Sequence, residues 1–170
     1  MYSLIRKSAV VLLSILILLP PSSTIAGPKD KPPKDKPLRL MDSGVFMFFP
    51  GGTSAALVGR GLSTHMGKIA SAGTFLNLGN SQSEPTCPNG FNGRIEGTAI
   101  AANGDKLEYV LVAEFCPDPN APGVFNGVGT YLITGGTGRF AGATGTGQFI
   151  GLADFNALTY NCLLSGTISY

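Results

Sequence analysis

Residues 106–116 read Lys106-Leu-Glu-Tyr-Val-Leu-Val-Ala-Glu-Phe-Cys116, and their polarity alternates along the chain. Apolar side chains such as Leu107, Tyr109 and Phe115 share one face, because successive side chains of a strand point to opposite sides. Charged side chains such as Glu108 and Glu114 occupy the other face. The stretch predicts a β-strand with one buried face and one mostly wet face.

The neighbouring segments extend this pattern. Asn103-Gly104-Asp105 supplies residues that tolerate positive φ, so 94–102 and 106–116 are predicted to form an antiparallel hairpin. Alternation returns in 159–170. Further strands are predicted near residues 44–50, 55–62, 67–78, 126–134 and 145–153.

The predicted fold class is all-β: a single closed antiparallel barrel of about eight strands. Short turns favour an up-and-down order, and closure removes the unpaired edges of the sheet. A two-sheet sandwich is the alternative. An apolar content of 44% is typical of one folded domain, which we place at 43–170.

The N-terminal residues read as a leader and a linker. Residues 1–26 hold two basic residues, an apolar run and a small-residue end, which predicts a signal peptide cleaved after Ala26. The run stops short of the about 20 residues that cross a bilayer, so no stable membrane insertion is expected. The Pro/Lys-rich segment 27–42 is expected to be a disordered, extended linker. The predicted location is secreted or periplasmic.

The glycine turn Gly135-Gly-Thr-Gly-Arg-Phe-Ala-Gly-Ala-Thr-Gly145 resembles a group of uncharacterised exported bacterial β-barrel proteins. Thr64-His-Met-Gly67 and the ending Gly166-Thr-Ile-Ser-Tyr170 resemble the same group. Residues 133–142 are also distantly similar to a turn of allene oxide cyclases and dirigent proteins. That similarity implies an eight-stranded barrel with a hydrophobic lumen, and a homo-oligomer. The matched residues form a turn, so no catalytic residue carries over.

Small residues such as Ala113 and Gly151 share the predicted inner faces with large aromatic residues, which predicts space inside the barrel. The leading functional hypothesis is a non-catalytic binder of a small hydrophobic ligand. The predicted lining residues are Tyr109, Phe115, Tyr131, Phe149 and Tyr160. One alternative is a cyclase or isomerase of allene oxide cyclase type, with His65 or Glu96 as its weak polar candidates. A structural envelope protein with a solid barrel is the other.

Other chemistry finds little support. Gly136-x-Gly138-x-x-Ala141 is similar to a dinucleotide fingerprint, but glycines follow where that motif requires a helix, so no cofactor is expected. Arg139 and Phe140 are expected to cap the barrel end. His65 is the only histidine, and no nucleophile elbow accompanies it. The predicted domain has no basic stripe, so nucleic acid is not expected as a partner.

The three cysteines lack a Cys-x-x-Cys pair, so no metal site is expected. An exported protein favours a disulfide. Cys116 falls on the wet face at a strand end and Cys87 lies in a turn-like segment, so we predict that these two are bonded. Cys162 shares an apolar face and is predicted to be a buried free thiol.

Overall fold

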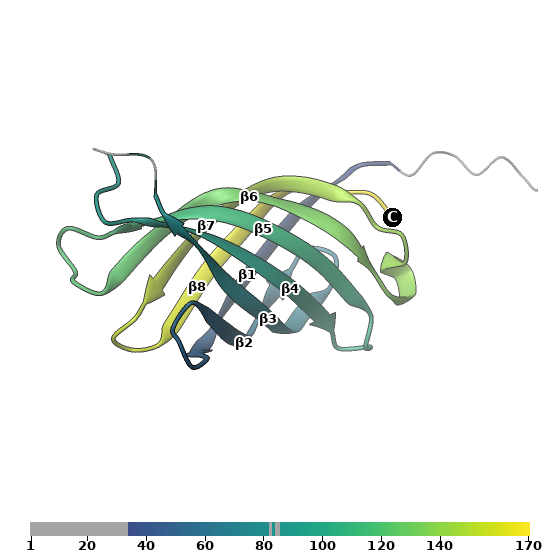
Figure 1. Ribbon diagram of the computed structural model, residues 1–170. Helices are drawn as coiled ribbons and strands as arrows, with labels where there is room; N and C mark the ends of the chain where they lie inside the picture. Colours follow the sequence, from purple (N-terminus) through teal and green to yellow (C-terminus); the bar gives the residue numbers. More distant parts are fainter. Residues whose placement is uncertain (1–33, 82, 84–85) are drawn as a thin grey trace, which may run out of the picture. The chain divides into compact units, whose positions relative to one another are not determined.

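The computed structural model describes residues 34–81, 83 and 86–170, which form a closed antiparallel β-barrel (Figure 1). Each strand pairs with the next and the last pairs with the first, so the order is up-and-down and the predicted all-β barrel is confirmed. The predicted signal peptide and residues 27–33 of the predicted linker lie outside the described residues. The strands are β1 (Lys36–Phe48), β2 (Ser54–Ser63), β3 (Gly67–Asn80), β4 (Phe91–Ala101), β5 (Lys106–Pro117), β6 (Val124–Gly136), β7 (Gly145–Asp154) and β8 (Thr159–Ile168).

The first strand begins at Lys36, so the predicted linker boundary at residue 42 is wrong. Leu38 and Leu40 point inward and are 2% and 0% exposed. They pair across from Gly166 and Leu164 of β8, and this pairing closes the barrel. Burial of two leucines outweighs the Pro/Lys-rich composition that had favoured an extended linker, because each contributes about 1.5–3 kcal/mol.

One end of the barrel is filled by side chains. Phe140 is fully buried at this end, as predicted, and its ring centroid lies 4.9 Å from that of Tyr170. Phe140 belongs to η1 (Gly138–Phe140), a short 3-10 turn between β6 and β7. Figure 1 shows the C-terminus beside this turn. Arg139 Nε lies 3.1 Å from Asp105 Oδ2 in the β4–β5 turn, so the ion pair ties two turns together across this end.

The turn η1 is not the long helix that a dinucleotide fingerprint requires, so the glycine-rich segment 135–145 is a structural turn. Gly138 and Gly142 adopt φ of +60° and +73°, which other residues rarely adopt. Within the part of the chain that the structure describes, no helix is long and apolar enough to span a bilayer.

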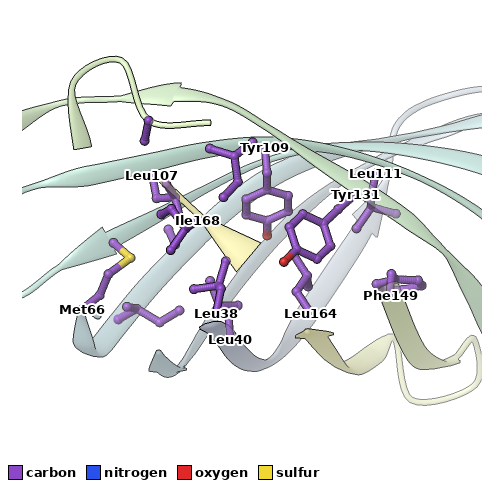
Figure 2. Packing of buried hydrophobic residues seen from close by; sticks show 14 of the residues in the cluster. Leu38, Leu40, Met66, Leu107, Tyr109, Leu111, Tyr131, Phe149, Leu164 and Ile168 are labelled. Carbon is purple, nitrogen blue, oxygen red and sulfur yellow. The ribbon is translucent and has the colours of Figure 1, made fainter. Parts of the chain in front are cut away.

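Figure 2 shows how the filled part of the interior packs, with the rings of Tyr109 and Tyr131 directed inward toward Leu40 and Leu164. The members of this core are large aliphatic and aromatic residues from all parts of the barrel wall. Those buried most completely include Leu38, Leu40, Leu107, Tyr131, Phe140, Leu164 and Ile168. This part of the barrel therefore has a solid core. The alternative of a structural protein had predicted such a core for the entire barrel.

The outer face is less polar than the alternating pattern predicts. Val128, Ile150, Leu163, Met41 and Leu62 are successive cross-strand partners over β6, β7, β8, β1 and β2. Four of them are 48–60% exposed. The expectation of a mostly wet outer face therefore holds for β4 and the start of β5, and fails over this row.

Candidate functional site

The other half of the interior contains a cavity of about 70 Å³. On this scale one water needs about 10–15 Å³, so the cavity has room for about five waters, roughly the space of a benzene-sized ring. It lies toward the end where β1 finishes and β8 begins. Its lining is mainly apolar and includes Phe46, Ala55, Leu57, Phe75, Phe91, Ile95, Tyr109, Leu111, Phe115, Phe149, Phe155 and Tyr160.

Phenylalanine rings surround the mouth of this cavity. Phe46, Phe48 and Phe155 form a triangle in which each pair of ring centroids is 5.4 Å apart and packs edge to face. Phe91 stacks on Phe115 with centroids 5.1 Å apart. Most of these rings are only partly buried, whereas the leucines at the filled end are fully buried. The mouth is therefore aromatic and accessible.

Inward glycines provide space for the aromatic groups. A Cβ on Gly97 would lie 2.6 Å from Cε2 of Tyr109, and one on Gly59 would lie 2.8 Å from Oγ of Ser71. A Cβ on Gly127 would approach the rings of Phe115 and Phe149 in the same way. Real side chains do not tolerate such close approaches. Neighbouring rings and hydroxyls therefore fill the space beside these glycines, and the cavity is the space that they leave empty.

A polar cluster lies on the cavity wall. Asp42 Oδ2 accepts a hydrogen bond of 2.6 Å from Ser71 Oγ and one of 2.9 Å from Tyr160 Oη. Ser71 Oγ and Tyr160 Oη are themselves 3.3 Å apart. Asp42 is 5% exposed, and its second oxygen, Oδ1, has no hydrogen-bond partner within the described residues. The cavity wall therefore contains one buried carboxylate oxygen that has no hydrogen-bond donor among the described residues.

Burial shifts the titration of the groups around Asp42. It raises the pKa of the Cys162 thiol to about 12, with a further increase from the negative charge of Asp42. It also raises the pKa of Tyr160, as does Asp42, whereas the hydrogen bond with Ser71 acts the other way. The pKa of Tyr109 is raised first by burial and then by Cys162, Asp42 and Tyr160. All three groups are therefore neutral near pH 7.

The structure brings most of the predicted lining residues together. Tyr109, Phe115, Phe149 and Tyr160 all line the cavity. Tyr131 instead packs in the solid core, 2% exposed, and its hydroxyl has no hydrogen-bond partner within the described part of the chain. Burial also raises the pKa of this hydroxyl.

The two polar candidates named for an enzyme are not in the cavity. His65 lies in the turn between β2 and β3, where Nε2 is 2.8 Å from the carbonyl oxygen of Pro37 and Nδ1 is 3.3 Å from Tyr170 Oη. Glu96 points outward from β4 and forms an ion pair of 2.7 Å with Arg94. His65 therefore has its partners at the filled end of the barrel, and Glu96 has its partner on the outer surface.

Sequence reasoning missed Asp42 and Ser71. Asp42 fell in the predicted linker, and Ser71 stands among small residues that carry no distinctive pattern. The signal that could have found Asp42 is its spacing from Leu38 and Leu40, which puts it on the inner face of the same strand. A carboxylate on a buried face is rare unless it is paired or functional.

The cysteines behave as predicted in their pairing. Cys87 and Cys116 form a disulfide, and Cys162 is a free thiol that is partly buried and lines the cavity. Glu114 lies close to both bonded sulfurs, but disulfide sulfurs are poor metal ligands. Glu114 accepts hydrogen bonds from Ser81 and Ser83, which lower its pKa. Cys87, Cys116 and Glu114 therefore form a structural cross-link.

Comparison with known proteins gave no match to a family model, a curated protein or a solved structure. The cavity and its polar cluster are therefore the features that bear on function.

Proposed function

We propose that the protein binds a small hydrophobic molecule in the open half of its barrel, without covalent chemistry. The observation that carries the proposal is the division of the interior. One half is packed solid, and the other keeps a cavity walled by Phe46, Phe91, Phe155 and other rings. Binding sites for small molecules are concave, mostly apolar and contain few polar groups. A purely structural barrel gains stability by filling this space.

Two measurements test this. Native mass spectrometry of protein purified from its own host should detect a bound small molecule. In vitro, ethylbenzene should bind and shift the NMR signals of cavity residues such as Gly97 and Ala153. Ala55→Leu adds volume inside the cavity and should abolish that binding. Ala56→Leu adds the same volume to the outer face of the same strand and should leave it unchanged.

A bare mass, together with no ethylbenzene shift in the wild-type protein, would contradict the proposal and favour the structural alternative. Equal loss of binding in Ala55→Leu and Ala56→Leu would show that the effect is not local to the cavity.

One observation favours an isomerase as a second candidate. Asp42 lines the cavity, its buried Oδ1 has no hydrogen-bond partner within the described residues, and Tyr160 donates a hydrogen bond to its Oδ2. Such a carboxylate could take a proton from one carbon of a ligand and return it to another, with no net change in atoms. Solvent deuterium would then enter a turned-over ligand from host extract. Asp42→Asn should abolish this exchange, whereas Glu96→Gln should not.

We also propose that the protein is exported. The leader pattern in residues 1–26 supports this, and the disulfide between Cys87 and Cys116 fits an oxidising compartment. N-terminal sequencing of protein recovered from its host should begin within a residue or two of Gly27. Retention of Met1 on the recovered protein would contradict export by cleavage.

A further inference from the structure

Asp42 is the feature of the cavity that the proposed function leaves unexplained. Apolar binding needs no buried carboxylate, and burying one is costly unless it is paired. Its Oδ2 already accepts two hydrogen bonds, from Ser71 and Tyr160, while Oδ1 accepts none within the described residues. Oδ1 is itself buried, so a ligand in the cavity that Asp42 lines reaches it only with a small rotation of the carboxylate, and would then supply the missing donor.

The charge of the site selects the kind of donor. Its described lining includes no Lys, Arg or His. The ion pairs of the described residues, Arg94 with Glu96 and Arg139 with Asp105, both lie away from Asp42. Ser71 and Tyr160 donate hydrogen bonds but bring no positive charge. A protonated amine would supply the missing donor and the missing countercharge together, in a charge-assisted hydrogen bond.

The rest of the lining describes the remainder of the ligand. Phe46, Phe48 and Phe155 present aromatic rings at the mouth, and such rings attract a cation as well as apolar groups. The cavity of about 70 Å³ has room for roughly one six-membered ring. We infer that the ligand is a small apolar amine, its ammonium group bound to Asp42 Oδ1 and its hydrocarbon part among the phenylalanines.

This inference rests on the proposed function, and its test uses three probes of nearly equal size and shape. Benzylamine carries an ammonium group at neutral pH, benzyl alcohol carries a neutral donor, and ethylbenzene carries neither. Their affinities are measured at pH 7 by NMR titration of the intact protein. We expect benzylamine to bind at least about tenfold more tightly than benzyl alcohol, the difference that a charge-assisted hydrogen bond supports, and ethylbenzene to bind more weakly still.

Two variants locate the effect. Asp42→Asn keeps the size of the side chain and removes its charge, so the preference for benzylamine over benzyl alcohol should disappear while ethylbenzene binds as before. Glu96→Gln removes an acid from the outer face and should leave all three affinities unchanged. Asp42→Ser serves the same purpose if Asp42→Asn does not fold, and the ranking in the wild-type protein is informative by itself.

The outcomes separate the two proposals. If ethylbenzene or benzyl alcohol binds as tightly as benzylamine, the cavity binds apolar molecules but the amine inference is overturned. If benzylamine is preferred equally by Asp42→Asn, its ammonium group does not bind Asp42 and the inference also falls. If none of the probes binds the wild-type protein, the proposed function itself fails.

Discussion

Tyr160 Oη donates a hydrogen bond of 2.9 Å to Asp42 Oδ2, although the two residues lie 118 positions apart in the sequence. They stand on β8 and β1, which pair along the line where the barrel closes. Ser71 on β3 completes the cluster. The polar wall of the cavity therefore forms only when the first and last strands have met.

Removing the Tyr160 hydroxyl should destabilise the fold. Tyr160→Phe leaves a buried carboxylate with one donor fewer, which costs about 1–3 kcal/mol. Tyr131→Phe is the matched control, because its hydroxyl is buried without a partner in the described structure, and its removal should be neutral or stabilising. Urea unfolding of both variants measures the difference. Equal losses would mean that the Tyr160 hydrogen bond contributes nothing specific.

The two halves of the interior should respond differently to truncation. Leu40→Ala in the solid core should lower the free energy of unfolding by about 2–5 kcal/mol, since it opens a new void. Leu57→Ala, at the cavity wall and only partly buried, should cost clearly less because its side chain already borders open space. Chemical denaturation of the two variants is the measurement. A larger cost for Leu57→Ala would contradict the assignment of the solid half.

The disulfide should be a substantial source of stability. Cys87 and Cys116 are separated by 29 positions, and closing a loop of that length contributes about 3–4 kcal/mol by restricting the unfolded chain. The double variant Cys87→Ala/Cys116→Ala should lose about that amount in urea unfolding. Cys162→Ala is the control and should keep the disulfide intact in peptide mapping. A disulfide joining Cys162 to another cysteine would overturn the pairing.

Stability should fall at alkaline pH. Cys162, Tyr109 and Tyr160 have raised pKa values in the folded protein, so the unfolded chain loses these protons first as the pH rises. Their contribution is complete below about pH 9 and declines as the pH rises from there toward 12 and beyond. Urea midpoints measured between pH 7 and 11 check this. The triple variant Cys162→Ala/Tyr109→Phe/Tyr160→Phe should have a flatter profile over the same range.

The same raised pKa makes Cys162 a slow nucleophile, because thiolate is the reactive form. Iodoacetamide at pH 8 should label it far more slowly in the native protein than in urea. Fast labelling of the native thiol would mean that Cys162 is exposed and ionised.

Much of the fold could be predicted from alternation, because strands such as β5 carry apolar residues on one face only. The β4–β5 hairpin and the barrel followed from that pattern and from Gly104. The candidate site was harder. In β1 the outward side chains of Met41, Val45 and Met47 are as apolar as the inward ones, so polarity does not distinguish the two faces. The spacing of Asp42 from Leu38 and Leu40 was the remaining signal for its inward position.

The depth of the cavity could not be predicted either. Inward glycines read as empty space in the sequence, but the rings of Tyr109 and Phe149 occupy the space above Gly97 and Gly127. Whether a glycine leaves a gap depends on the side chains of neighbouring strands, and their rotamers are set only by the assembled barrel.

The unequal filling of the barrel gives its two ends different tolerances to change. The base, closed by Phe140 and the leucines of β1, carries the packing that keeps the strands together. The partly buried phenylalanines of the rim contribute less to this packing. Substitutions there can therefore alter the shape and chemistry of the cavity mouth with little loss of folding stability. Ligand selectivity can therefore change through substitutions at the rim of the barrel while the residues of the base stay constant.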